Sequence, residues 1–224
     1  MEHPFFLCED LRKKIGKQPL LQGVTLSAQG GTAVGIFAPK SDARTALSQI
    51  LIGVLSPDTG SLTLDGKAPS SRLVAYAPEH CALPRHLSVD ALVGLYEDAF
   101  HGFDTERATA LFSTLGLDTK KPICHLSPAT RKIVQIILTA CRKAKLYLFE
   151  APIVKSNAAQ SALLLDIILG TRKPESLLCI VSGAPTLYEG KTDAAYFLSD
   201  GALVAYSATA EGEGIDDAYR RLFS

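Results

Sequence analysis

Apolar residues along the chain follow two alternating patterns. Short runs that are apolar almost throughout, at 33–37, 146–149 and 177–182, are typical of strands buried on both faces of a sheet. Longer segments, 129–142 and 158–170, place their apolar residues at helical spacing. Strands of this kind alternating with helices predict an α/β fold, with a largely parallel sheet that is covered by helices on both faces.

Other segments add antiparallel strands and a helical block. Segments 5–15 and 19–28 predict antiparallel strands at an edge, and 194–206 predicts a hairpin around Ser199-Asp200-Gly201. From Ser88 to Leu115 the spacing is helical. We therefore expect a core formed by residues 1–84 and 146–224, with a small helical subdomain at 85–145.

Composition excludes several classes of partner. The 224 residues are 47% hydrophobic, and 23 basic residues balance 23 acidic ones, so no net field favours nucleic acid or an anionic membrane. No apolar run approaches the ~20 residues of a membrane span, which argues against direct membrane insertion. Five scattered cysteines without a CxxC pair indicate a reducing cytosol. We expect a cytoplasmic protein that reaches a membrane only through partners.

The segment between the strand at 33–37 and the following helix, expected from Thr45, has the length and position of a phosphate-binding loop, GxxxxGK[ST]. Ala38 and Ala43 stand in place of the two glycines, Arg44 in place of the lysine, and Thr45 is unchanged. Glycines let successive backbone N–H groups point into one anion-sized cavity, so the alanines disfavour that cradle. Asp42 would also face a bound phosphate, and at ~5 Å and a dielectric of ~20 that repulsion is roughly 3 kcal/mol.

Several segments, in their order and spacing, resemble the nucleotide-binding subunit of ATP-binding-cassette (ABC) transporters. The most specific match is LIGVLSPDTGSLTLDG at 51–66. The others are the opening strands at 21–31, the Q-loop entry Tyr76-Ala77-Pro78-Glu79, the start of the signature motif at Leu126-Ser127, the Walker B strand at 145–152 and the closing hairpin at 196–204. The resemblance covers nearly the whole chain.

This resemblance implies a P-loop NTPase-like core that binds ATP and Mg²⁺. The positions that correspond to nucleotide-binding residues are Ala38, Lys40, Ser41, Ala43, Arg44, Thr45, Glu79 and Ser127. Thr45 and Glu150 take the positions of the Mg²⁺ ligands, and Glu150 is the one candidate catalytic residue near the Walker B position.

The chain departs from the family's pattern where hydrolysis is concerned. Glu150 and Ala151 stand in place of the Walker B aspartate and the catalytic glutamate, and Ala151 cannot act as a general base. Ala184 stands in place of the switch histidine. Asn157 replaces the aspartate of the loop after Walker B, and Pro128-Ala129 replace the two glycines of the signature motif.

From these departures we expect a catalytically impaired subunit of a membrane transporter complex, at the cytoplasmic face of the membrane. It would act as a structural or regulatory partner of a second, competent ABC ATPase subunit and of transmembrane subunits, which by resemblance would contact residues 79–87. Two alternatives stay open. One is an atypical but active ATPase that uses Arg44, Thr45 and Glu150, and the other is a non-transport adaptor of the same fold.

Overall fold

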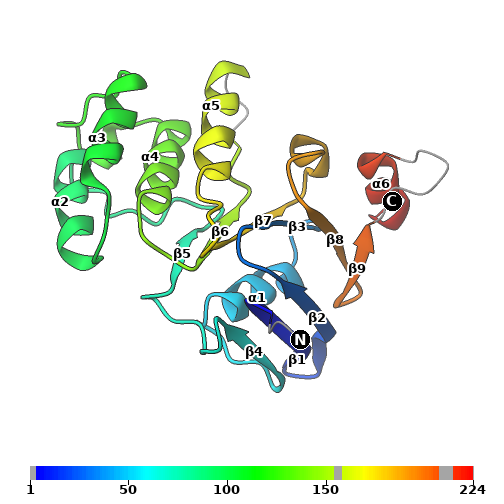
Figure 1. Ribbon diagram of the computed structural model, residues 1–224. Coiled ribbons are helices and arrows are strands. Elements are labelled where there is room, and N and C mark those ends of the chain that lie inside the picture. Colours follow the sequence, from blue (N-terminus) through cyan, green and yellow to red (C-terminus); the bar gives the residue numbers. More distant parts are fainter. Residues whose placement is uncertain (1–3, 154–157, 207–213, 224) are drawn as a thin grey trace.

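Six strands form the main sheet of the computed structural model, which describes residues 4–153, 158–206 and 214–223 (Figure 1). Their order across the sheet is β5-β6-β7-β3-β8-β9, and each neighbouring pair is parallel except β8 and β9. The strands are β3 (Ala33–Phe37), β5 (Val74–Ala77), β6 (Leu146–Glu150), β7 (Leu177–Ser182), β8 (Ala194–Ser199) and β9 (Ala202–Tyr206). The α/β class and the mostly parallel sheet that the sequence predicts are confirmed.

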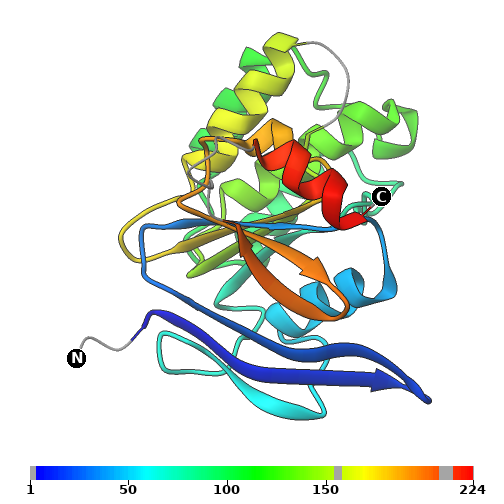
Figure 2. The ribbon, with the colours of Figure 1, turned by 90° about the vertical axis from the view of Figure 1, so that its right-hand side faces the viewer.

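Three more strands form a second, antiparallel sheet with the order β2-β1-β4. They are β1 (Phe6–Ile15), β2 (Gln18–Ala28) and β4 (Thr59–Leu64). Figure 2 shows this sheet packed across helix α1 (Asp42–Leu51) from the main sheet. Leu47, Ile50 and Leu51 of α1 are buried in the cluster that both sheets share. The antiparallel strands are therefore a layer of their own, and α1 is enclosed between two sheets.

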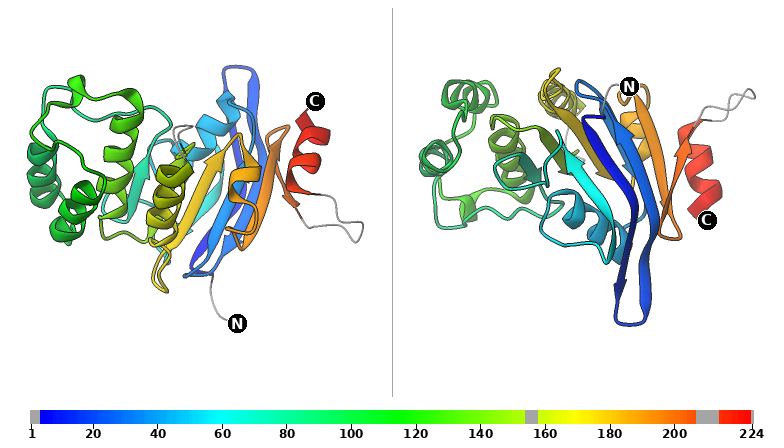
Figure 3. Two further views of the ribbon diagram at one scale, coloured as in Figure 1. Left: turned by 90° about the horizontal axis from the view of Figure 1, so that it is seen from above. Right: turned by 60° about the horizontal axis from the view of Figure 1, so that its bottom comes forward.

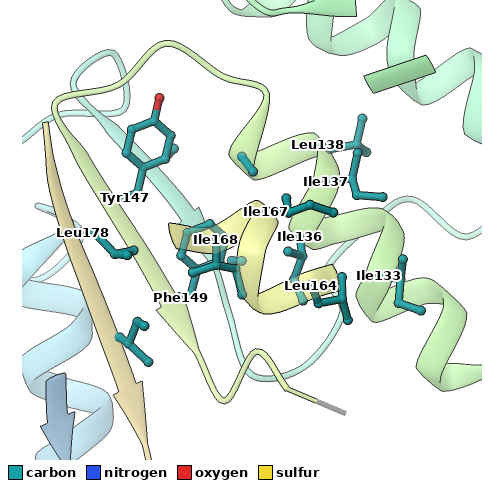
Figure 4. Packing of buried hydrophobic residues seen from close by; sticks show 14 of the residues in the cluster. Ile133, Ile136, Ile137, Leu138, Tyr147, Phe149, Leu164, Ile167, Ile168 and Leu178 are labelled. Atoms are coloured by element: carbon teal, nitrogen blue, oxygen red, sulfur yellow. The ribbon is translucent and has the colours of Figure 1, made fainter. Parts of the chain in front are cut away.

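Helices cover the opposite face of the main sheet (Figures 1 and 3). They are α4 (Pro128–Ala140) and α5 (Ala158–Leu169), with α2 (Val89–Ala99) and α3 (Thr105–Thr114) farther from the sheet. Figure 4 shows the packing between them, in which Ile133, Ile136 and Ile137 of α4 and Leu164, Ile167 and Ile168 of α5 meet Phe149 and Leu178 of the sheet. Alternate residues of the buried strands serve the two faces: Phe149 points to this cluster and Leu148 to the cluster around α1.

The structure differs from the expected elements at three places. The strands at 5–15 and 19–28, expected at an edge of the sheet, form a separate sheet with β4, because their hydrogen-bond partners are one another and β4. Helix α1 begins at Asp42, three residues before the start expected at Thr45. A helix that the sequence pattern did not predict, α6 (Ile215–Phe223), packs Tyr219 and Phe223 against Phe197 of β8. Within the described ranges, no helix is long and apolar enough to cross a membrane.

The start of β4 depends on a glycine, Gly60, which is the second residue of the strand. Gly60 has a φ of 93°, and a Cβ there would lie 2.5 Å from the carbonyl oxygens of Glu9 and Asp10. Gly66 offers a matched control, because its φ is 70° but a Cβ would meet nothing within 4 Å.

We predict that Gly60→Ala lowers the free energy of unfolding by about 3 kcal/mol or more, because it adds a backbone clash to the cost of a left-handed φ. Gly66→Ala should cost only about 1 kcal/mol, since it carries the φ cost alone. Urea unfolding followed by circular dichroism measures both. Equal losses in the two variants would contradict the close approach of β4 to β1.

Candidate functional site

The loop between β3 and α1 is closed by its own residues. Ser41, whose φ of −155° is extended, is the N-cap of α1. Its Oγ accepts a hydrogen bond from the Arg44 amide at 3.2 Å, and its carbonyl oxygen accepts from the Thr45 amide and the Thr45 hydroxyl, both at 3.1 Å. Asp42 adds a negative charge to the first helical turn, where it stabilises the helix dipole. The amides of Arg44 and Thr45 thus bond to Ser41, and the Asp42 carboxylate supplies the negative charge at the N-terminus of α1.

The Arg44 side chain turns inward under this loop. It is only 7% exposed, its Nη1 donates to the Ala38 carbonyl oxygen at 3.0 Å, and its Nη2 lies 2.6 Å from Glu79 Oε2. Lys40 stays exposed at the surface, with its Nζ 3.5 Å from Glu79 Oε1 and 2.9 Å from His80 Nε2. The two residues that replace the family's lysine and glutamine, Arg44 and Glu79, therefore form an ion pair with each other.

Glu150, at the end of β6, faces the end of β5. Its Oε2 accepts a hydrogen bond from the Tyr76 hydroxyl at 2.6 Å and from the Glu79 amide at 3.2 Å. Burial, and secondly this hydrogen bond to Glu150, raise the pKa of Tyr76, so the phenol stays a donor. One Glu150 carboxylate oxygen therefore holds the chain that leads from Tyr76 to Glu79.

Lys132, on the second turn of α4, belongs to the same network although the sequence analysis did not single it out. It is 6% exposed, and its Nζ donates to the carbonyl oxygens of Pro78, of Glu79 at 3.1 Å and of Glu150 at 2.9 Å. Burial lowers the pKa of Lys132 to about 8, while the charges of Glu150 and Glu79 oppose that fall. The available signal was a lysine on a helix whose next two residues, 133 and 134, are apolar and buried.

Small residues occupy the positions that hold catalytic groups in the family's pattern, as the sequence indicates. Ala151 has a φ of 39°, in the left-handed region that favours glycine, and its amide donates to the Val181 carbonyl at 2.8 Å. The amide of Ala184 donates to Ser182 Oγ at 3.1 Å. A methyl group at the neighbouring Gly183 would lie 3.3 Å from the Ala38 carbonyl oxygen, 3.6 Å from Arg44 Nη1 and 3.7 Å from the Tyr219 hydroxyl, so α6 borders the loop as well.

The structure brings together most of the site residues that the sequence predicted. Residues 38–45, Glu79 and Glu150 meet at the carboxyl ends of β3, β5 and β6. Ser127 instead caps α4: its Oγ accepts from the Thr130 amide at 3.1 Å and lies 2.8 Å from Thr130 Oγ1. The turn that it caps borders a cleft of about 500 Å³ that is also lined by Glu79 and Ala151. Asn157 lies outside the described residues.

Comparisons with known proteins place this geometry in a family context. No family model matches the chain. The chain is 24% identical over 189 residues to the Fe(3+) ions import ATP-binding protein FbpC of Pseudomonas fluorescens, a match that covers 79% of this chain and 51% of that protein. It is 27% identical over 165 residues to the cytochrome c biogenesis ATP-binding export protein CcmA of Nitrobacter winogradskyi, with coverage of 71% and 82%. The chain thus spans about half of the first relative and most of the second.

Solved structures give the same assignment of the fold. The ATP-binding subunit of an ABC transporter superposes with a TM-score of 0.87 at 17% identity, over 98% of this chain and all of that one. A nucleotide-free ATP-binding cassette from an ABC transporter superposes with a TM-score of 0.70, also at 17% identity, over 98% of this chain and 95% of that one. The chain is therefore related to the ATP-binding subunits of ABC transporters and has their fold.

Proposed function

We propose that this chain is a catalytically impaired ATP-binding-cassette subunit of a membrane transporter complex, which acts as a structural or regulatory partner of a competent ATPase subunit. The observation that carries the proposal is the ion pair between Arg44 and Glu79, at 2.6 Å, with the arginine 7% exposed. A nucleotide phosphate would need a free cation at this position. Here the cation is neutralised by a carboxylate of the same chain.

The residues at the loop do not fit a Mg²⁺-bound triphosphate. To contact a phosphate, Arg44 would have to leave Glu79 and the Ala38 carbonyl, and an unpaired buried charge costs about 3–5 kcal/mol. The hydroxyl of Thr45, which takes the position of a Mg²⁺ ligand, donates to the Ser41 carbonyl oxygen. The first-turn amides that would receive the phosphate are bonded to Ser41. These contacts support a site that is complete without nucleotide.

Hydrolysis would lack its proton acceptor even if a nucleotide entered. The position of the catalytic base holds Ala151, and the Glu150 carboxylate holds Tyr76 and the Glu79 amide. Loss of a general base lowers the rate of hydrolysis by a factor of about 10²–10⁴. Nothing in the contacts of Arg44, Thr45 or Glu150 favours the alternative of an atypical ATPase, because the side chain of each is bonded within the chain.

The proposed role in a complex rests on the retained fold. Two relatives are named as an Fe(3+) ions import ATP-binding protein and a cytochrome c biogenesis ATP-binding export protein. By analogy, residues 79–87 would contact a transmembrane subunit, and the exposed Ser127 at the N-terminus of α4 would face the nucleotide of the competent subunit. The dipole of α4 and the Ser127 hydroxyl are the groups that this chain offers there, since Pro128 has no N–H.

We predict that the isolated chain shows no Mg²⁺-dependent ATP binding with a Kd below about 1 mM, which corresponds to a binding free energy of roughly −4 kcal/mol. Calorimetric titration with Mg·ATP, with and without EDTA, measures it, and phosphate release should stay at the level of the blank. Mg²⁺-dependent binding that Arg44→Met abolishes would refute the proposal in favour of a working site.

A second prediction concerns repair of the loop. Arg44→Lys with Glu79→Gln, combined with Ala38→Gly and Ala43→Gly, should raise the Mg²⁺-dependent affinity for ATP by about tenfold or more, because it frees a cation and restores the flexible backbone. The control carries the two glycines alone, and it should gain little since Arg44 stays bound to Glu79. Equal gains in both variants would show that the ion pair does not close the loop.

A third prediction tests how the ion pair contributes to stability. Glu79→Gln should lower the free energy of unfolding by about 3 kcal/mol, because it leaves the buried Arg44 charge without a partner. Arg44→Met should cost less, since Glu79 is 29% exposed and lies 3.5 Å from Lys40. A double-mutant cycle in urea measures the coupling, expected at about 1–3 kcal/mol. Equal single losses with a coupling near zero would mean that the pair is solvent-screened.

A further inference from the structure

A second cleft lies at the opposite end of the strands of the main sheet from the loop of Ala38. It has a volume of about 1030 Å³ and is lined by residues 71–73, 140–145 and 147, and 173 and 175, which precede or begin β5, β6 and β7. Residues between 98 and 107, at the junction of α2 and α3, form the remaining wall. Because β5, β6 and β7 are parallel, this cleft is at their amino ends, whereas Glu79 and Glu150 are at or beyond their carboxyl ends.

The lining of this cleft is cationic although the chain as a whole is neutral. Six lining residues are Arg or Lys and three are Asp or Glu, an excess of three positive charges: Arg72, Arg107, Arg142, Lys143, Lys145 and Lys173 against Asp98, Asp104 and Glu175. A concave surface with one sign of charge concentrates ions of the opposite sign.

Most of these cations have no carboxylate partner among the described residues. Lys145 pairs with Asp65, which lies outside the cleft, and in the part of the chain that the structure describes the other five cations form no ion pair. Asp104 is used as the N-cap of α3, where its Oδ1 accepts from the Arg107 amide at 2.9 Å. The positive charge of the cleft is therefore not neutralised by the carboxylates within it.

Arg142 is one of the lining cations, and its side chain is held by several contacts. Its guanidinium lies 3.6 Å from the centroid of the Phe100 ring, and its Nη2 donates to the Ser71 carbonyl at 2.7 Å. Its Nε is buried and has no hydrogen-bond partner within the described residues. Burial lowers the pKa of Arg142, which reflects the cost of holding this charge away from water. A buried N–H donor without an acceptor costs about 1–3 kcal/mol, so this part of the Arg142 side chain is held at a cost.

The chain around Arg142 is held in place before any ligand binds. Figure 4 shows Tyr147 with its hydroxyl directed away from the buried cluster, toward the segment that joins α4 to β6. This hydroxyl donates to the Arg142 carbonyl and accepts from the Ala144 amide at 3.2 Å. Stacking on Phe100 fixes the other end of the Arg142 side chain. A fixed guanidinium loses little entropy when it binds an anion.

We propose that this cleft binds a small multivalent phosphate anion, either an inorganic polyphosphate or the phosphate chain of a nucleotide without Mg²⁺. Guanidinium groups match phosphate oxygens in pairs, and the excess of three positive charges suits the higher charge of linked phosphates better than a single carboxylate. Cations that come from four separate segments around one concavity suit several linked phosphates better than a single one. The proposal is independent of the proposed function, because none of the residues of this cleft belongs to the loop of Ala38.

The test is calorimetric titration of the full chain with sodium tripolyphosphate and, separately, with ATP in EDTA. We expect saturable binding to both, weakened as ionic strength rises. Arg142→Met should weaken the affinity for tripolyphosphate about tenfold or more. Arg72→Gln with Lys173→Gln, two exposed residues whose loss leaves the fold intact, should do the same. Lys17→Gln, in the turn between β1 and β2, is the matched control and should change nothing.

The outcomes separate this proposal from the one for the loop. If the cleft variants bind tripolyphosphate as tightly as the parent chain, or if no variant of any kind alters a weak affinity, the proposal is wrong. If Arg44→Met with Glu79→Gln abolishes binding while the cleft variants do not, the anion binds at the loop, and both this inference and the impaired loop are refuted. Citrate binding as tightly as tripolyphosphate would overturn the assignment to phosphate. Loss of binding in the cleft variants alone supports the proposal and leaves the proposed function untouched.

Discussion

The ion pair between Arg44 and Glu79 connects the parts of the fold that meet at the carboxyl ends of the parallel strands. Arg44 comes from α1 and Glu79 from the chain that leaves β5, and the Glu79 amide is in turn bonded to Glu150 at the end of β6. Lys132, on α4, donates to the backbone carbonyl oxygens of Glu79 and Glu150. Two buried cations and two carboxylates balance within this network. A site built to hold a triphosphate needs an excess of positive charge, and here that excess is neutralised internally.

Two departures from the family's pattern that look independent in the sequence are one interaction in the structure. Arginine in place of lysine keeps the positive charge, and glutamate in place of glutamine adds the negative charge that neutralises it. At a separation of 2.6 Å each satisfies the other. Helix α1 shows the same logic, because Ser41 and Asp42 supply the acceptor and the negative charge that its N-terminus otherwise takes from a phosphate. The loop is thus a stable structure in its own right.

The sequence was sufficient for elements whose signal is local. The strand at 177–182 and the hairpin around Asp200 follow from runs of apolar residues and a turn. The start of α1 was placed too late because the phosphate-loop frame took precedence over a plain N-cap at Ser41 followed by Asp42. Helix α6 was missed although acidic residues in its first turn and arginines in its last mark a helix. The partner of Arg44 could not be predicted, since it depends on how β5 is placed relative to α1.

The distribution of unmatched charge reverses what an open parallel sheet leads one to expect. Ligands of such sheets bind at the carboxyl ends of the strands, and in this chain the buried cation there, Arg44, is paired with Glu79, while five cations near the amino ends form no ion pair among the described residues. Stabilisation of the C-terminus of α4 accounts for Arg142 and Lys143, since cations are favourable there. It does not account for Arg72, which lies in the connection from β4 to β5 and follows no helix, nor for a guanidinium that stacks on Phe100 instead of pairing with Asp98. The positive charge at the amino edge therefore needs a cause other than the stability of a helix, and an anion bound in the cleft is the one that the contacts of Arg142 support.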